Sequence, residues 1–374
     1  MTPTDPIPLA KPWMGDDEVT SVSEVIRSGW LLQGPKVASF EQKLAKRLSV
    51  RHAVALSSGT ASLHAALVAL GVGSGDEVIV PSYSFVASAS TVRMVGAVPV
   101  FADINLATYN LDPNSVEEAV TTKTKAICAV HQLGLPADLS PLEDIANRHG
   151  LILYEDAACA LGSTFHDRPI GGHSTLACFS FHPRKIITTG EGGLVTTNSD
   201  ELATRLRRLR QHGRPNAKAD AAEGRGQPPA SLGFNYRMTD IQAALGIAQM
   251  NRLDNILARR RSIAQRYDEA LAEIEFLEAP FVPPNRSHNY QSYQILVRPD
   301  APLSRDVLLE RLRRQGILAG PGVTCIHRRD DYRSRRPLPK SEEAEDHSMI
   351  VPLFPQMTDE QVDRITSALR DLMH

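Results

Sequence analysis

Residues 179–193 read F-S-F-H-P-R-K-I-I-T-T-G-E-G-G and join an apolar, strand-like lead to one lysine and a glycine-rich turn. Ser180 lies in the lead, and Lys185 follows it by five residues. The glycines that come next permit another group to approach the backbone closely. A lone lysine is most often a solvated surface charge. Lys185 therefore indicates chemistry only if other segments bring complementary groups to it.

Short apolar runs alternate with helix-like segments around this stretch. The runs are A-V-A-L (53–56), V-I-V (78–80), A-V-P-V-F-A-D (97–103), K-A-I-C-A-V-H (125–131), L-I-L-Y-E-D (151–156), L-A-C-F-S-F (176–181) and G-L-V-T-T-N (193–198). Most are continuously apolar, which is typical of strands buried on both faces of a parallel sheet. We therefore predict an α/β fold whose large domain has a mostly parallel, seven-stranded sheet sandwiched by helices.

The rest of the chain predicts helices around this domain and a smaller one after it. We expect a large domain over residues 1–250, including an N-terminal helical segment, and a small C-terminal α/β domain over residues 251–374. Further expected elements are helices at 16–28 and 37–48, a surface loop at 213–230, a long helix at 239–274 that bridges the domains, a strand at 293–297 and helices at 304–315 and 359–373.

Charge and composition favour a small-molecule substrate. The 374 residues include 41 basic and 43 acidic side chains and carry a formal net charge of -2, so we expect neither a nucleic-acid nor a membrane partner. The four cysteines occur singly, which predicts reduced, buried thiols and no metal site. The N-terminal segment has no signal-like pattern and no run is long enough to span a bilayer, so we expect a cytoplasmic protein.

Two segments near predicted strand ends offer an anion site and an aromatic face. In S-S-G-T (57–60) a strand gives way to a helix, so Gly59 and Thr60 are candidates to hold a phosphate at the helix start, although an ordinary N-cap is the alternative. In P-S-Y-S-F (81–85) we expect Tyr83, Ser84 and Phe85 near the ligand crevice, because loops at the carboxyl ends of parallel strands line it. Phe85 is a candidate to stack on a flat ring, with plain core packing as the alternative.

A further segment, L-I-L-Y-E-D (151–156), brings two carboxylates to the end of a buried strand. A buried carboxylate is costly unless it is paired. A protonated pyridine nitrogen is a suitable partner for Asp156, and Lys185 is then the amine that carries pyridoxal phosphate as a Schiff base. The alternatives for Asp156 are a helix N-cap and a structural salt bridge.

Nine motifs of the chain occur in an order that resembles one known family. They are S-S-G-T-A-S-L-H-A-A-L, P-S-Y-S-F-V-A-S-A, G-A-V-P-V-F-A-D-I, V-H-Q-L-G-L-P-A-D-L, Y-E-D-A-A-C-A-L-G, F-S-F-H-P-R-K-I-I-T-T-G-E-G-G, L-R-Q-H-G, G-F-N-Y-R-M-T-D-I-Q-A-A-L-G and V-P-L-F-P-Q-M-T. Together they resemble the DegT/StrS sugar aminotransferases, which are fold-type I pyridoxal-phosphate enzymes. The resemblance extends from about Trp30 to the C-terminus.

The resemblance implies a role for residues at matching positions. Lys185 is implied as the Schiff-base lysine and Asp156 as the partner of the pyridine nitrogen. The other residues implied to bind the cofactor are Phe85 on the ring face, Cys159 beside the ring, and Gly59, Thr60 and Ser180 around the phosphate. Asn235 is implied to reach the phosphate of a neighbouring subunit, which predicts a homodimer with shared sites. Arg237, His327 and Tyr332 are implied to lie toward the substrate.

Two positions depart from the family pattern. Cys159 stands where relatives commonly have Gln or His in contact with the cofactor ring, and a thiol hydrogen-bonds weakly. Thr324, in G-V-T-C-I-H, stands where relatives often place a tyrosine before the histidine. Both changes concern the ring and the substrate end of the pocket.

The implied reaction is a ping-pong transamination. An amino acid, which the resemblance implies is glutamate, gives its amino group to the cofactor, and a keto-sugar then receives it. We expect a nucleotide-linked 4-keto-6-deoxy sugar, whose phosphates suit Arg237 and the basic cluster of Arg328, Arg329 and Arg333 unless that cluster is only a solvated face. The alternatives are a keto-cyclitol or 3-keto-sugar aminotransferase, a related dehydratase, which Lys185 disfavours, and a non-catalytic sensor that binds the cofactor.

Overall fold

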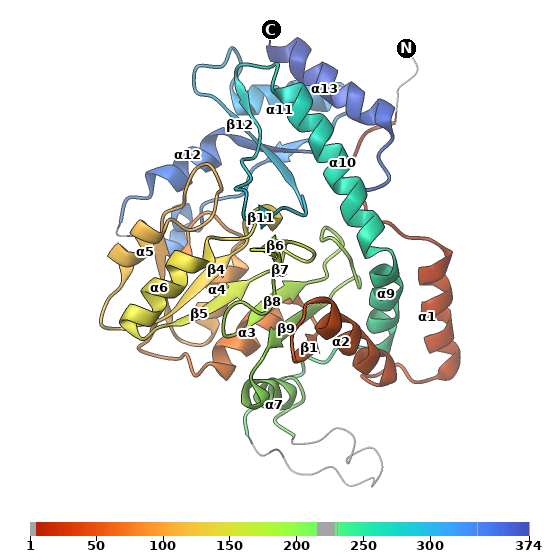
Figure 1. The fold of residues 1–374 in the computed structure, drawn as a ribbon, viewed down its shortest axis with the longest axis vertical. Helices are drawn as coiled ribbons and strands as arrows, with labels where there is room; N and C mark the ends of the chain where they lie inside the picture. The colour runs from red at the N-terminus through yellow and green to blue at the C-terminus, as the bar shows by residue number, and fades with distance from the viewer. Residues whose placement is uncertain (1–4, 215–228, 230, 335, 374) are drawn as a thin grey trace.

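A seven-stranded sheet forms the centre of the molecule (Figure 1). The computed structural model describes residues 5–214, 229, 231–334 and 336–373. The strand order is β1-β9-β8-β5-β4-β2-β3, and only β9 runs antiparallel to its neighbours β1 and β8. The bounds are β1 His52–Leu56, β2 Glu77–Pro81, β3 Val98–Ala102, β4 Thr124–Val130, β5 Ile152–Asp156, β8 Ala177–Ser180 and β9 Gly193–Thr197. The predicted mostly parallel sheet of seven strands is confirmed.

Helices cover both faces of this sheet. Along β1, Ala53 and Ala55 belong to the apolar core on one face, whereas Val54 belongs to the core on the other. This explains why the strands read as continuous apolar runs. The first face packs against α2 (Pro35–Arg47), α5 (Pro113–Ala119), α6 (Leu139–His149) and α9 (Asp240–Asn251). The second face packs against α3 (Gly59–Ala69), α4 (Ala87–Met94) and α7 (Asp200–Leu209).

The N-terminal helices dock on α9. Helix α1 spans Asp16–Ser28, and its Glu18 accepts a hydrogen bond of 2.8 Å from Gln249 of α9. The carboxylate of Asp240, the first residue of α9, accepts backbone N–H bonds from Gly34 and Val37 at the start of α2, at 2.8 and 3.0 Å. Buried carboxylate bonds therefore fix α9 against both N-terminal helices.

The long helix predicted at 239–274 is two helices. Helix α9 ends at Asn251, and α10 runs over Leu253–Leu271. Between them Arg252 has φ -108° and ψ 7°, outside helical geometry, and its side chain pairs with Glu18 and Asp17 of α1. Helix α10 then runs along one side of the molecule toward the C-terminal elements (Figure 1).

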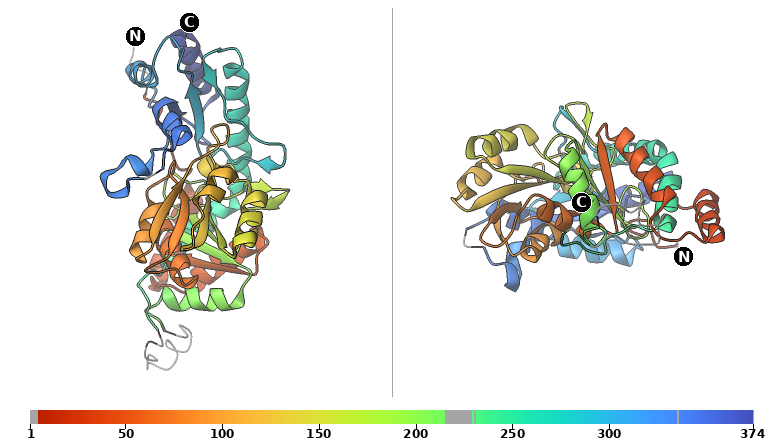
Figure 2. Two further views of the ribbon diagram at one scale, coloured as in Figure 1. Left: turned by 90° about the vertical axis from the view of Figure 1, so that its left-hand side faces the viewer. Right: turned by 90° about the horizontal axis from the view of Figure 1, so that it is seen from below.

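The C-terminal elements have a core of their own and form the upper lobe in the side view of Figure 2. Their antiparallel sheet has the order β10-β12-β14-β13. Ile7 also belongs to this core and pairs with Ile317, so the start of the described chain packs with its end. The bounds are β10 Leu277–Glu278, β12 Tyr293–Val297, β13 Gly320–Pro321, β14 Ser348–Val351, α11 Arg305–Arg314, α12 Pro339–His347 and α13 Asp359–Met373.

A small three-stranded sheet, β11-β6-β7, joins the two regions, and the described residues also include the 3-10 helices η1, η2 and η3. Their bounds are β6 Thr164–Phe165, β7 Arg168–Pro169, β11 Arg286–Ser287, η1 Gln132–Gly134, η2 Ile326–Arg328 and η3 Asp330–Tyr332. The loop predicted at 213–230 lies almost entirely outside the described residues. Within the described ranges, no helix has both the length and the apolar character needed to cross a bilayer.

Candidate active site

Lys185 lies beside the end of β5. Strands β5 and β8 are parallel neighbours, with Asp156 opposite Cys178, and the backbone N–H of Ala157 continues the pairing to Cys178 at 2.8 Å. The chain after β5 turns through Cys159, and the chain after β8 turns through Lys185. These turns meet, since Nζ of Lys185 lies 3.2 Å from Sγ of Cys159. The amine therefore stands next to the strand end that carries Asp156.

Asp156 is buried, with 5% of its surface exposed, and both of its carboxylate oxygens have donors. Ser88 Oγ donates to Oδ2 at 2.7 Å, and the backbone N–H of Ala158 donates to Oδ1 at 3.2 Å. Ser84 Oγ lies 3.0 Å from Ser88 Oγ and extends the chain of polar groups. Sequence reasoning did not single out Ser88, which lies in the first turn of α4 while Ser84 lies in the loop before it.

Glu155, the second carboxylate of the strand end, has a structural role. Its side chain is fully buried, 2.8 Å from His131 Nε2, and accepts bonds from the N–H and hydroxyl of Ser174. Because His131 Nδ1 accepts from the N–H of Ala137, the ring hydrogen on Nε2 points at Glu155. Burial raises the pKa of Glu155, but the bonds from His131 and Ser174 outweigh burial and leave that pKa below its ordinary value. Glu155 is thus satisfied within the core.

The start of α3 makes an anion cradle with the end of β8. Gly59 and Thr60 are the first residues of α3, so their backbone N–H groups have no acceptor within the helix. Ser58 is an N-cap and accepts from the N–H of Ala61 at 3.1 Å. A Cβ on Gly59 would lie 2.7 Å from Cβ of Ser180, which brings these two residues into contact. The N-cap and the free N–H groups therefore occur together at this helix start.

The loop after β2 presents one exposed aromatic ring and buries another. Phe85 is 73% exposed, so its ring is available to a ligand or to another subunit. Ser84 is buried against Ser88. Tyr83 is fully buried and turns away from solvent toward the C-terminal elements, where its hydroxyl lies 3.0 Å from Gln294 Oε1 and 2.7 Å from Ser348 Oγ. Tyr83 was expected near the ligand crevice, but its polar partners hold its hydroxyl inside the protein.

The segment that carries Asn235 and Arg237 lies close to the anion cradle. The backbone carbonyl of Tyr236 accepts from the N–H of Ser57 at 2.9 Å, which ties this segment to the residues before α3. Asn235 is exposed, and its backbone forms a bridge with Gln211. Arg237 is half-buried.

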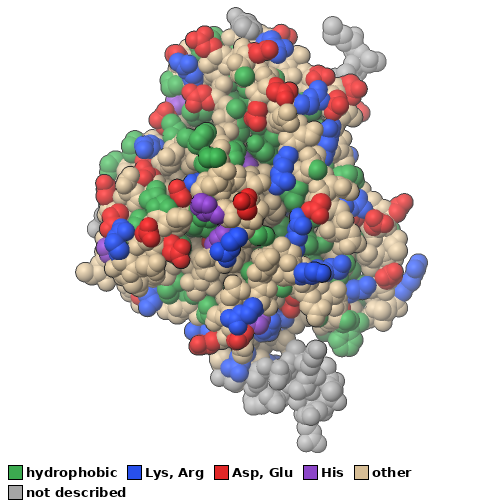
Figure 3. All heavy atoms as spheres, in the orientation of Figure 1, with side chains coloured by type: hydrophobic (Ala, Val, Ile, Leu, Met, Phe, Trp, Pro, Cys, Tyr) green, Lys and Arg blue, Asp and Glu red, His purple; other side chains and the backbone are tan. Residues whose placement is uncertain are grey.

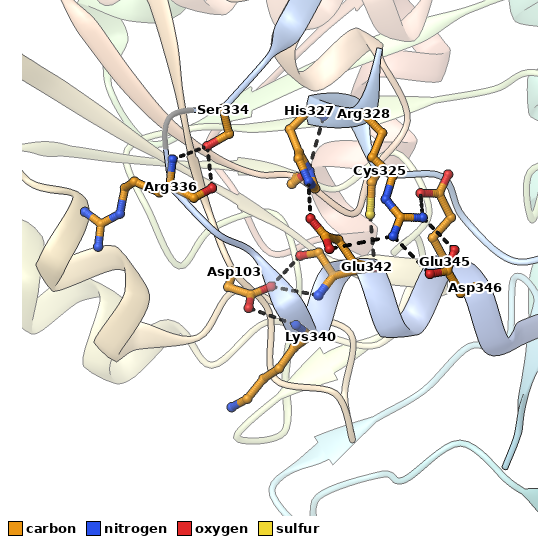
Figure 4. A network of polar contacts seen from close by, with 12 residues as sticks. Asp103, Cys325, His327, Arg328, Ser334, Arg336, Lys340, Glu342, Glu345 and Asp346 are labelled. Carbon is orange, nitrogen blue, oxygen red and sulfur yellow. Dashed lines mark hydrogen bonds and ion pairs between the residues drawn. The ribbon is translucent and has the colours of Figure 1, made fainter. Parts of the chain in front are cut away.

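His327 and Tyr332 are held in contacts between the two regions of the chain. His327 Nδ1 lies 2.5 Å from Ser82 Oγ, and its Nε2 lies 2.9 Å from Glu342 Oε1 (Figure 4). Tyr332 packs under Arg93, whose guanidinium carbon is 5.1 Å from the ring centre, and beside Phe101 of the edge strand β3. The two residues therefore help to attach the segment 325–346 to the large sheet.

Acidic partners surround part of the predicted basic cluster. Arg328 pairs with Glu345 at 3.0 Å and with Asp346 at 2.5 Å, and its bonds to Asp346 raise the pKa of the guanidinium further. Arg333 pairs with Asp330, and Arg329 donates to Thr324 Oγ1 at 3.2 Å. On the face shown in Figure 3, basic and acidic side chains are likewise interspersed. Arg328 is thus occupied by acidic partners, which fits a phosphate site less well than the alternative of a surface cluster without a ligand.

The groups that meet at these strand ends fit pyridoxal phosphate. Lys185 supplies an amine, Asp156 a buried carboxylate with fixed hydrogen bonds, and the start of α3 with Ser180 supplies hydroxyl and N–H donors for a phosphate. The close contact of Gly59 with Ser180 leaves no room for a larger side chain in this cradle.

Comparisons with known proteins agree with this chemistry. The sequence matches the DegT/DnrJ/EryC1/StrS aminotransferase family over residues 12–370. The fold is similar to the aminotransferase TlmJ from Streptoalloteichus hindustanus (TM-score 0.91, 32% identity, 98% of each chain covered). It is also similar to PseC of Helicobacter pylori, an aminotransferase involved in the biosynthesis of pseudoaminic acid (0.92, 28%, 99% of each). A Streptococcus pneumoniae protein, Spr1654, solved in a PLP form, matches as well (0.92, 29%, 98% of each). The chain belongs to the DegT/DnrJ/EryC1/StrS aminotransferase family and is a pyridoxal-phosphate-dependent sugar aminotransferase.

Proposed function

We propose that this enzyme transfers the amino group of L-glutamate to a nucleotide-linked 4-keto-6-deoxy sugar by a ping-pong mechanism. One observation carries the proposal: the amine of Lys185, the buried carboxylate of Asp156 and the cradle of Gly59 and Ser180 lie at adjacent strand ends. When bound, pyridoxal phosphate supplies an electron sink that stabilises negative charge on the carbon that loses its proton.

The residues of the chain would divide the work as follows. Lys185 holds the cofactor covalently, and its amine, once released, moves a proton from the α-carbon of the donor. Asp156 keeps the ring nitrogen protonated, which is supported by its burial and by the donors Ser88 and Ala158 that fix its oxygens. Gly59, Thr60 and Ser180 bind the phosphate, and Phe85 covers a ring face. Cys159 lies beside Lys185 at the ring edge.

The sugar end of the proposal rests on fewer groups. Arg237 is half-buried near the cradle and is the candidate for a substrate phosphate. His327 and Tyr332 stay candidates only if substrate binding releases them from Ser82 and Arg93. A keto-cyclitol or a 3-keto sugar would use the same donor chemistry and is the alternative substrate. A sensor that binds the cofactor without turnover is the alternative of another class.

We also propose a homodimer with shared sites, working in the cytoplasm. Asn235 is exposed in the single chain, as a residue that reaches a neighbouring subunit must be. Trp30, Leu31 and Leu32 are 51%, 45% and 66% exposed and offer apolar area for a second copy. We also propose a domain boundary near residue 250. The start of α10 at Leu253 supports it, because this helix leads toward the C-terminal elements.

Donor specificity is tested by adding single amino acids to the cofactor-loaded enzyme. Glutamate should remove the visible absorbance of the lysine-bound cofactor and release 2-oxoglutarate. If no amino acid removes that absorbance, the sensor is favoured over the enzyme. The enzyme loaded with the amine form of the cofactor should then be offered nucleotide-linked 4-keto and 3-keto sugars and keto-cyclitols, and product formation with only one class decides the acceptor.

Shared sites are tested with mixed subunits. Neither Lys185→Ala nor Asn235→Ala alone should be active, but a hybrid of the two contains one site with both native residues. Recovery of activity on mixing supports the shared site. Absence of recovery in a dimer shown to have exchanged subunits counts against it.

A further inference from the structure

We propose that Cys159 and Lys185 form a modification site, at which a peroxide joins the two side chains through a direct sulfur–nitrogen bond. The starting observation is the 3.2 Å separation between Cys159 Sγ and Lys185 Nζ. A thiol and an amine in van der Waals contact need little movement to become bonded.

The backbone holds both residues in this arrangement. The carbonyl of Cys159 accepts a bond of 2.7 Å from Asn289 Nδ2, and the N–H of Ala160 closes the same turn on Ala157 at 2.9 Å. The N–H of Lys185 is bonded to the carbonyl of His182 at 2.8 Å. The two turns follow the adjacent, paired strands β5 and β8, so their backbones lie side by side. In this arrangement the amine of Lys185 reaches the sulfur of Cys159.

Cys159 also differs from the other three cysteines. Cys128, Cys178 and Cys325 are buried, and burial raises the pKa of each of these thiols. Cys159 is partly exposed, as is Lys185. Because thiol oxidation follows access and thiolate character, a small peroxide should reach Cys159 first. The sequence-based expectation of four buried thiols is wrong for Cys159, which is only partly buried in the turn after β5.

The chemistry proceeds in two balanced steps. Hydrogen peroxide oxidises the thiol to a sulfenic acid, as the O–O bond breaks and one water is released. The neutral amine of Lys185 then attacks the sulfur, the N–S bond forms and the S–O bond breaks, and hydroxide leaves with the amine proton as a second water. In sum, one thiol, one amine and one hydrogen peroxide give one S–N link and two waters. Two equivalents of an added thiol reverse the link and restore both side chains.

The modification would compete with the cofactor. This competition rests on the proposed role of Lys185, because one amine cannot be bonded to both the cofactor and Cys159. Peroxide would then form the S–N bond in protein whose Lys185 is free. It would not form the bond in protein whose Lys185 carries the cofactor. The link would protect Cys159 from irreversible oxidation and block reloading until a thiol reduces it.

The test is peptide mass spectrometry after hydrogen peroxide treatment, with and without saturating pyridoxal phosphate. The cofactor-free protein should yield a peptide pair joined at Cys159 and Lys185 that is lighter by two hydrogens than the separate peptides and that dithiothreitol separates. Lys185→Arg should give no link and should carry Cys159 on to the sulfinic acid. The matched control Cys325→Ser keeps the reactive pair and should form as much link as the native protein.

Four other results of this experiment would contradict the S–N bond or the proposed role of Lys185. The proposal is overturned if, in native cofactor-free protein, Cys159 stays reduced. It is also overturned if Cys159 is oxidised without a bond to Lys185. A joined pair that retains one oxygen overturns the direct S–N bond. If the link forms equally with and without pyridoxal phosphate, the modification site stands and the proposed role of Lys185 fails.

Discussion

Ser88 Oγ donates a hydrogen bond of 2.7 Å to Oδ2 of Asp156. Ser88 lies in the first turn of α4, just after the loop that carries Phe85, whereas Asp156 ends β5. This one hydrogen bond between buried groups therefore connects the segment that carries Phe85, the candidate for the ring face, to Asp156, the candidate partner of the ring nitrogen. Any change at Ser88 should alter both parts of the cofactor site together.

Ser88→Ala should weaken cofactor binding. A hydrogen bond to a charged group contributes about 1.5–3 kcal/mol, so the dissociation constant for pyridoxal phosphate should rise roughly ten- to a hundredfold. Absorbance titration of the cofactor-free protein measures this. Ser84→Ala is the control, because Ser84 bonds to Ser88 Oγ and not to Asp156. Equal affinities for the native protein and Ser88→Ala would mean that the Ala158 N–H alone fixes Asp156.

Gly59→Ala should disturb the anion cradle. The added Cβ would lie 2.7 Å from Cβ of Ser180, so the start of α3 must move away from β8. Overpacking of this kind costs about 1–3 kcal/mol, and here the loss should be seen in phosphate binding. Gly73→Ala is the control, since its Cβ would meet nothing closer than Val95 O at 3.9 Å. Titration with pyridoxal phosphate and with pyridoxal should show a loss for the phosphorylated form alone; a loss for both would indicate general unfolding of the site.

The sequence predicts the positions of the strands better than the direction of side chains. Short apolar runs, most of them continuous, predicted all seven strands, because burial on both faces of a sheet is seen in local composition. The side chain of Tyr83 is directed by its hydrogen bonds to Gln294 and Ser348, which are more than two hundred residues away in the sequence. No local pattern encodes that contact. The break between α9 and α10 at Arg252 also involves a contact distant in sequence. The side chain of Arg252 pairs with α1 where the backbone leaves helical geometry, and helix periodicity does not reveal this.

Glu155→Gln should destabilise the protein at neutral pH and flatten its response to acid. A glutamine amide would place a donor against His131 or against Ser174, and an unsatisfied buried donor costs about 1–3 kcal/mol. The folded-state pKa of Glu155 is lowered from 4.5, so its stabilisation is complete above that value and is lost as pH falls through the folded pKa. Urea unfolding at a series of pH values should therefore show that the difference between native protein and variant shrinks below pH 4.5.

The titration of His288 and a surface variant, Glu117→Gln, serve as controls for this unfolding experiment. Burial lowers the pKa of His288 to about 3, so native protein and variant both lose stability as pH falls below 6.5, and only their difference reports on Glu155. Glu117→Gln is the matched variant, because Glu117 is bonded to His149 and Arg148 at the exposed surface. Its stability should follow that of the native protein closely. A difference for Glu155→Gln that stays constant from neutral to acid pH would exclude the titration of Glu155 as its cause.

Tyr83→Phe should loosen the attachment between the loop after β2 and the C-terminal elements. The Tyr83 hydroxyl contacts Gln294 and Ser348 and accepts the N–H of Val323 at 3.0 Å, so the variant leaves buried polar groups without a partner at about 1–3 kcal/mol. Tyr267→Phe is the control, since Tyr267 is equally buried but bonds to Pro352 O within the C-terminal region. Both variants should lower Tm, but only Tyr83→Phe should speed amide hydrogen exchange around Val323. Unchanged exchange there would show that Tyr83 stabilises the core without holding this segment, because loss of its bond to Val323 exposes that N–H directly.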